Sequence, residues 1–129
     1  KRHWRHNQRF IMIYKIPHTS SALQTQNFVH MGKSLTLTTR WNTVMQFWNI
    51  DVYDNIEQKW LTQSEALSLG SASLYHLDLP FVFVMLDDSE YGSLKVSQEA
   101  MGDTLNVYIV NKGDYDASVQ KSLSINYRK

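Results

Sequence analysis

Hydrophobic and polar positions alternate with a period of two along most of the chain, which is typical of β-strands with one face buried. Around Leu35 and Leu37 the alternation is clean: these leucines share one predicted face with Trp41, while threonines and an arginine occupy the other. Half-buried strands of this kind favour antiparallel sheet. We predict strands over Arg9–Ile16, Ser34–Trp41, Thr43–Tyr53, Leu79–Leu86, Thr104–Val110 and Val119–Tyr127, with brief edges at Gln58–Leu61 and Leu94–Val96.

Two of these segments depart from simple alternation. Leu79–Leu86 is apolar almost throughout, and a run this short predicts a central strand packed on both faces. In Arg9–Ile16 apolar side chains fall on both predicted faces, so we expect that strand to be covered on both sides as well.

Other segments favour turns, loops or a helix. His18–Asn27 is rich in Ser, Thr and Gln and reads as a loop, and Asp54-Asn55 favours a turn. Thr62–Leu69 is the one helix candidate, because Thr62 and Glu65 have capping-box spacing and a glycine follows. At the turn predicted over Asn111–Asp114, Gly113 would supply a positive φ.

Six to eight short strands without alternating β and α units predict an all-β fold. We expect an antiparallel β-sandwich of the jelly-roll type, with at most one short loop helix. The basic residues 1–9 would form an N-terminal arm, and residues 10–129 would form a single sandwich domain.

Composition excludes several classes of protein. The 129 residues include no cysteine, which rules out a disulfide scaffold, thiolate metal sites and a cysteine nucleophile. The longest apolar run is too short for a membrane helix, so we expect no membrane insertion. Because the chain starts at Lys1 rather than at methionine, we expect a processed product or a trimmed fragment, from which a signal peptide or anchor could have been lost upstream.

Positive charge is concentrated at the N-terminus. The first fifteen residues hold five of the thirteen basic residues and no acid, although the net charge of the chain is only +1. Such a segment releases counterions on binding a polyanion, and a tryptophan within it offers a flat face for an unpaired base. The candidate nucleic-acid-binding residues are Lys1, Arg2, Trp4, Arg5, Arg9 and Lys15. A solvated terminus is the alternative interpretation.

The remaining chemistry-bearing residues are scattered. Glycines are isolated, histidines lack metal-ligand spacing, and His76 near Asp78 is best explained as a structural pair. The acidic turns Asp87-Asp88 and Asp114–Asp116 could hold Ca²⁺, but solvated turns explain them as well. With no convergent set of titratable groups, we expect no enzyme, no bound metal and no cofactor.

The three tryptophans beyond the arm allow a sugar-binding platform, because aromatic faces stack on pyranose rings. Trp41 and Trp48 lie on predicted core faces, however, so packing is their expected role. Only Trp60 has an ambiguous placement.

The overall plan resembles the jelly-roll coat proteins of small single-stranded DNA viruses such as nanoviruses, geminiviruses and circoviruses. The resemblance is carried by the basic arm, by Phe81–Asp88 as a buried strand before a charged turn, and by the final segments Thr104–Val110 and Ser122–Lys129. It implies a many-copy icosahedral shell whose arm binds the packaged genome, expected to be single-stranded, without sequence preference.

The leading hypothesis is therefore a viral coat protein located in the virion. The alternative is a secreted or surface β-sandwich binding module: an adhesin, a carbohydrate-binding module, or a subunit of a phage tail or fibre. Polar Ser, Thr, Asn and Gln faces fit that class equally well. A small hydrolase with a sandwich fold ranks last.

Overall fold

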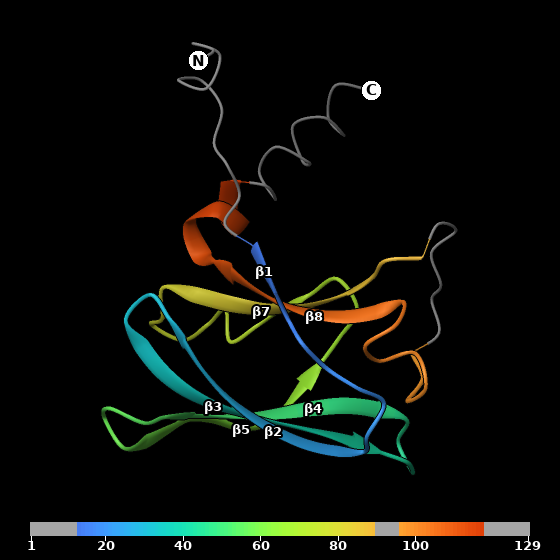
Figure 1. Ribbon diagram of the computed structural model, residues 1–129. Coiled ribbons are helices and arrows are strands. Elements are labelled where there is room, and N and C mark those ends of the chain that lie inside the picture. Colours follow the sequence, from blue (N-terminus) through green and yellow to red (C-terminus); the bar gives the residue numbers. More distant parts are fainter. Residues whose placement is uncertain (1–12, 90–95, 118–129) are drawn as a thin grey trace, which may run out of the picture.

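Two four-stranded antiparallel sheets face each other across one hydrophobic core (Figure 1). The computed structural model describes residues 13–89 and 96–117. The described strands are β1 (Ile13–Ile16), β2 (Leu23–His30), β3 (Lys33–Asn42), β4 (Phe47–Asp54), β5 (Lys59–Leu67), β6 (Ala72–Ser73), β7 (Phe81–Asp87) and β8 (Leu105–Asn111). One sheet has the order β1-β8-β7-β6 and the other the order β2-β3-β4-β5.

The all-β antiparallel sandwich predicted from the sequence is confirmed, and one short helix, residues 112–117, follows β8 in the described part. The connectivity differs from a jelly roll. A jelly roll consists of two Greek keys. In each Greek key three strands are joined by hairpins, and a long connection brings the fourth strand back beside the first. Here β2, β3, β4 and β5 form a meander, because each strand pairs with the next one along the chain. No helix among the described residues is long and apolar enough to cross a membrane.

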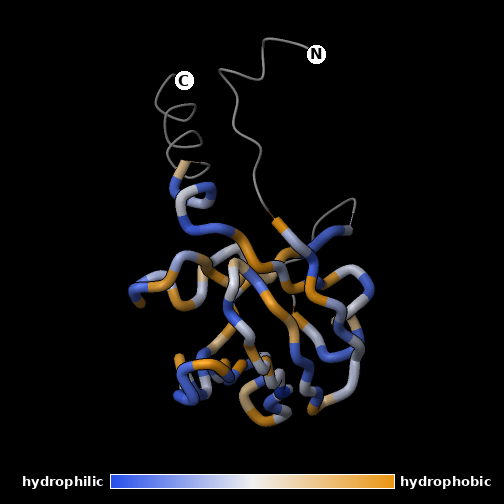
Figure 2. The backbone as a smooth tube through the Cα atoms, turned by 60° about the vertical axis from the view of Figure 1, so that its left-hand side comes forward, coloured by the Kyte–Doolittle hydropathy of each residue, from blue (hydrophilic) through white to orange (hydrophobic). Residues whose placement is uncertain are grey.

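The predicted inner faces of β3 and β4 are confirmed. Leu35 and Leu37 of β3 and Trp48, Ile50 and Val52 of β4 are fully buried. Burial alternates along the middle of β3, which places one side of that strand toward the core. Figure 2 shows apolar and polar residues interspersed along the chain, as such strands require.

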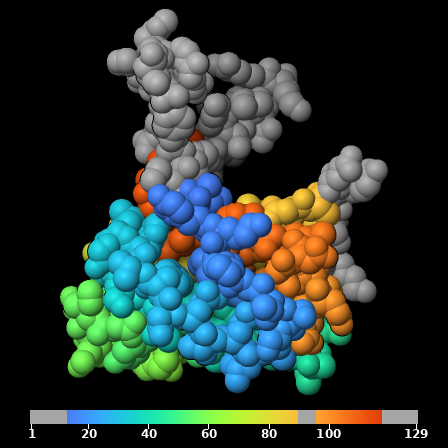
Figure 3. All heavy atoms as spheres, viewed as in Figure 1, coloured from blue at the N-terminus to red at the C-terminus, as the bar shows by residue number. Residues whose placement is uncertain are grey.

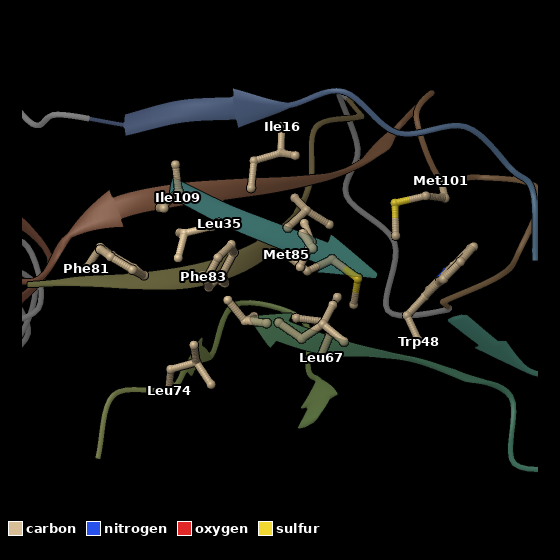
Figure 4. Packing of buried hydrophobic residues seen from close by; sticks show 14 of the residues in the cluster. Ile16, Leu35, Trp48, Leu67, Leu74, Phe81, Phe83, Met85, Met101 and Ile109 are labelled. Atoms are coloured by element: carbon tan, nitrogen blue, oxygen red, sulfur yellow. The ribbon is translucent and has the colours of Figure 1, made fainter. Parts of the chain in front are cut away.

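β7 is the central strand that its continuous apolar sequence predicts. It pairs with β6 on one side and β8 on the other, and its residues Phe81–Met85 are all buried. Phe81, Phe83 and Met85 belong to the core between the sheets (Figure 4). Val82 and Val84 form a second small cluster with Val110 of β8. Burial on both faces explains why the strand lacks alternation.

The predicted loop at His18–Asn27 is wrong from Leu23 onward, where β2 begins. β2 is an edge strand with an alternating burial pattern, and its inward positions are Gln24, Gln26, Phe28 and His30. Polar residues are tolerated there because an edge strand stays half in contact with water. Its hairpin to β3 turns through Met31 and Gly32, which both have positive φ, as a type I′ turn requires.

The strand predicted over Thr43–Tyr53 begins only at Phe47. Residues 43–46 form the turn between β3 and β4, in which Asn42 accepts hydrogen bonds from the main-chain N–H groups of Met45 and Gln46. Gln46 has a positive φ. Val44, assigned to a core face by the alternation, is 88% exposed.

The predicted helix Thr62–Leu69 is wrong, because most of it belongs to strand β5. Thr62 does contact the Glu65 carboxylate, at 3.5 Å, but inside a strand. The buried Asp51 of β4 accepts a hydrogen bond from the main-chain N–H of Ser64 at 2.6 Å, and Ser64 has a positive φ. β5 is bulged against β4 at this point. A cross-strand carboxylate thus overrides the local capping signal.

Asp51 also binds Arg40 of β3 through two hydrogen bonds of 2.7 and 2.8 Å, and the guanidinium holds the pKa of this carboxyl below its usual range. We expect Asp51→Asn to lower the free energy of unfolding by about 1–2 kcal/mol at neutral pH, because the charged pair is lost. The stability gap between wild type and variant should shrink as pH falls below about 3.8, where the unfolded carboxyl becomes protonated. Urea denaturation at several pH values measures it, and a gap that persists at low pH would contradict this account.

The two ends of the sandwich also differ from expectation. β1 forms an edge, and Ile13 and Tyr14 are 41% and 48% exposed, so this part of the predicted strand is not covered on both sides. Gly113 lies in the helix 112–117 and is not among the positive-φ glycines, so the predicted turn is replaced by a helix start. The strand predicted over Val119–Tyr127 lies outside the described residues.

Candidate functional site

A groove of about 460 Å³ opens between β1 and β2, the edge strands of opposite sheets. The two strands diverge from their connection in Figure 1, and both are exposed on the face seen in Figure 3. We call this cavity the edge groove. Its lining residues are Tyr14, Lys15, Ile16, Pro17, Gln26, Phe28, Val29, His30, Met31, Ile109 and Asn111.

Polar contacts between the sheets fix the two ends of the edge groove. At one end His30 of β2 forms a 3.1 Å hydrogen bond between its Nε2 and Asn111 Oδ1, and its ring meets those of Tyr14 and Phe81 edge-on at 5.5 and 5.7 Å. At the other end the Gln26 side chain donates to the Pro17 carbonyl at 2.6 Å. The groove is therefore held open by structure already present in the single chain.

The walls of the edge groove are mainly aromatic and aliphatic. Lys15 is the one side chain of full charge among its described lining residues, and no carboxylate is included. Tyr14 and His30 are its other ionisable side chains. Aromatic and aliphatic walls with a few polar groups are suited to an apolar or extended peptide segment.

The main chain of β2 offers further hydrogen-bonding groups beside the groove. Trp41 N–H donates to the Ala22 carbonyl at 2.8 Å, and in antiparallel pairs the bonded positions recur at every second residue. From this register the N–H and C=O groups of Thr25, Asn27 and Val29 point away from β3. β2 pairs with no other described strand, so these groups face the open edge.

The predicted nucleic-acid-binding residues are not brought together in the described structure. Lys15 lies on β1, exposed and beside the edge groove. The other members of the set lie outside the described residues: Lys1, Arg2, Trp4, Arg5 and Arg9. Their role stays a prediction from the sequence.

The acidic turns are occupied by internal hydrogen bonds. Asp88 accepts from Asn106 at 2.8 Å and from the Tyr108 hydroxyl at 2.5 Å. Burial, followed by the bond to Asp88, raises the pKa of Tyr108 to about 12. Asp116 accepts from the Tyr75 hydroxyl at 2.6 Å, and Asp114 is buried. Within the described ranges no group of three His, Cys, Asp or Glu side chains could hold a metal ion.

The tryptophans divide as their positions predict. Trp48 is fully buried in the core, and Trp41 packs against it with a ring distance of 5.3 Å. Trp60 on β5 is half exposed, with its ring edge-on to Tyr53 at 4.9 Å. Two of the three candidate platform residues are thus packing residues.

His18 sits in the connection between β1 and β2, where Nδ1 donates to the Ile16 carbonyl at 3.0 Å and Nε2 lies 2.9 Å from the Thr39 hydroxyl. Burial lowers its pKa, although the bond to Ile16 opposes the shift. The fold therefore favours the neutral ring. We expect stability to be lost as pH falls below about 6.5, by at most about 1.4 kcal/mol per pH unit for this proton.

The measurement is urea denaturation of wild type and His18→Asn between pH 7.5 and pH 5. Asparagine keeps a donor for the Ile16 carbonyl and does not titrate, so the other histidines cancel in the comparison. If the free energy of unfolding changed with pH equally in both proteins, His18 would not contribute to the loss of stability at low pH.

The edge groove was missed by sequence reasoning because one of its two walls is formed by β2, which was predicted as a loop up to Asn27. The available signal was the absence of glycine, proline and charge between Ala22 and His30, together with β-branched Thr25 and Val29.

Comparison with known families settles the relationship of the chain. The family model described as cyanophage baseplate Pam3 plug gp18 matches residues 13–112. The chain belongs to this family. The match runs from the first residue of β1 to just beyond β8, so it covers both sheets and the edge groove. No curated protein matches the chain.

The family membership overturns the resemblance to coat proteins of single-stranded DNA viruses. That resemblance rested on alternating strands, a buried strand and a basic arm, features that unrelated sandwiches share. The broader expectation, a viral structural protein of the virion, is supported. The alternative of a phage-tail subunit fits the match better than a genome-binding capsid protein.

Proposed function

We propose that this chain is a plug subunit of a phage tail baseplate, acting as a structural part through protein contacts. The observation that carries the proposal is the family match, which spans the sandwich as a whole. The site agrees with this role, since the edge groove offers apolar walls, an unpaired strand edge and a single lysine. We propose no enzymatic step, because the described groove brings no acid–base pair together.

The proposal is tested by locating the chain in purified virus particles. Heads and tails are separated after mild disruption, and each fraction is analysed by quantitative mass spectrometry, with the major head protein and the tail tube protein as markers. The chain is expected to follow the tail marker. Recovery with the heads, or absence from purified particles, would overturn the assignment.

A genetic experiment addresses the role itself. Particles grown without the chain, from a genome carrying an amber codon in its gene, should have incomplete tails that regain their baseplate when the chain is supplied in trans. Tails of normal appearance and infectivity in its absence would contradict a baseplate role.

A further inference from the structure

Three of the four outer sheet edges carry features that hinder further strand pairing. β6 has only two residues, and the described part of β1, Ile13–Ile16, ends at Pro17. β5 is bulged against β4 and contains Ser64 with positive φ as well as Lys59 and Glu65. Short strands, prolines, charges and bulges are the usual protections of an edge.

The edge of β2 has none of these protections. Its eight residues include no Asp, Glu, Lys, Arg or Pro, and their register with β3 is unbroken. Two apolar side chains, Leu23 and Val29, stand near its ends on the outer face and are 62% and 71% exposed. A long, uncharged, regular edge is a template for pairing with another strand.

We propose that β2 pairs antiparallel with β2 of a second copy of this chain, about a two-fold axis at Gln26. In this register Leu23 lies opposite Val29 of the second copy, and Thr25 lies opposite its Asn27. These are the residues whose main-chain groups face outward, so the pairing forms regular antiparallel hydrogen bonds. The two sheets β2-β3-β4-β5 become one eight-stranded sheet.

The strand complements itself, which is why a copy is the favoured occupant. The exposed leucine and valine of each chain meet across the new pair, and apolar cross-strand pairs stabilise sheets. The pairing brings no like charges together across the two-fold axis, because β2 contains no Asp, Glu, Lys or Arg. In the same register the inward-facing Phe28 of the second copy lies opposite the inward-facing Gln24.

The inference rests on the geometry of the edge and is independent of the proposed role in a baseplate. A protein with the same edge strand but another function would form the same pair. A baseplate subunit that stays monomeric would still belong to the same family. Failure of one proposal therefore leaves the other standing.

The first test is the mass of the full chain in solution, by sedimentation equilibrium over a range of concentrations. Wild type is expected to form a dimer, and Val29→Lys should raise its Kd about tenfold or more, because both Leu23–Val29 pairs are lost. Val44→Lys is the matched control: it replaces another exposed valine, 88% exposed in the β3–β4 turn, and should leave the Kd unchanged.

A second variant tests the main-chain bonds. Thr25→Pro removes an N–H that faces away from β3 and pairs with no other described strand, and proline is tolerated where an edge N–H faces solvent. It should give a monomer with the far-ultraviolet spectrum of wild type. A dimer that survives Thr25→Pro and Val29→Lys would overturn pairing through β2.

A disulfide reports the register directly, since the chain has no cysteine of its own. Gln26→Cys places two thiols on the axis, at a non-hydrogen-bonded pair with Cα atoms about 4.5 Å apart, within disulfide range. In the control Gln24→Cys the two cysteines are offset by four residues, about 13 Å, and should not cross-link. Cross-linking of both or neither would overturn this register. A wild-type monomer, alone or bound only to a strand of another protein, would overturn the proposal.

Discussion

Replacing Gly102 with alanine is expected to lower the free energy of unfolding by about 3 kcal/mol, the sum of backbone strain and steric conflict. Gly102 has φ +88°, and a Cβ built there would lie 2.3 Å from the main-chain oxygen of His18 and 3.0 Å from its carbonyl carbon. Both atoms belong to backbone, so no side chain can move aside. Urea denaturation followed by circular dichroism measures the loss.

Gly32→Ala is the matched control for this prediction. Gly32 has φ +78° in the β2–β3 turn, and a Cβ there would meet nothing within 4 Å. It should cost only the strain of the backbone, about 1 kcal/mol. Equal losses in the two variants would mean that the loop around Gly102 moves away from His18 without penalty.

The contact at Gly102 matters because it clamps the connection between the two edge strands. On one side of it His18 reaches Ile16 and Thr39, and on the other Gln98 donates to the Ser20 carbonyl at 2.9 Å. This connection joins β1 to β2, the two strands that flank the edge groove. If the contact between Gly102 and His18 is lost, we expect the edge groove to unfold locally before the core does.

The strands that the sequence identifies correctly are those with a decisive apolar pattern. β3 alternates because only one of its faces is buried. β7 is continuously apolar because both of its faces are buried. β2 was missed up to Asn27, and β5 was predicted only over Gln58–Leu61, because the polar residues of these two edge strands give no clear periodic signal. The capping box at Thr62 and Glu65 is a real local preference, but the contact from Asp51 to Ser64 is formed between strands and cannot be read locally.

The candidate site was harder to predict than the fold for a similar reason. The edge groove joins Tyr14, Phe28 and Ile109 from three strands, and His30 meets Asn111 across 81 positions of sequence. Its position depends on which strands form the edges, and periodicity does not report strand order. The basic arm gives a stronger signal in the sequence, but all of its predicted binding residues except Lys15 lie outside the described residues.

The second large effect is expected at Trp48. We predict that Trp48→Ala lowers the free energy of unfolding by about 3–5 kcal/mol, because a fully buried indole leaves a cavity in the core. Its Nε1–H also donates to the Ser97 carbonyl at 3.3 Å, which ties β4 to the segment before Gly102. Circular dichroism in urea is the appropriate readout, since fluorescence changes with the tryptophan itself.

Trp60→Ala separates packing from surface binding. Trp60 is 50% exposed and makes one edge-on aromatic contact with Tyr53, so its loss should cost about 1 kcal/mol. If Trp60→Ala destabilised the protein as much as Trp48→Ala, its ring would be part of the core. The expected difference instead leaves Trp60 as the exposed tryptophan of the described residues, on β5 at the opposite edge of the sheet from β2.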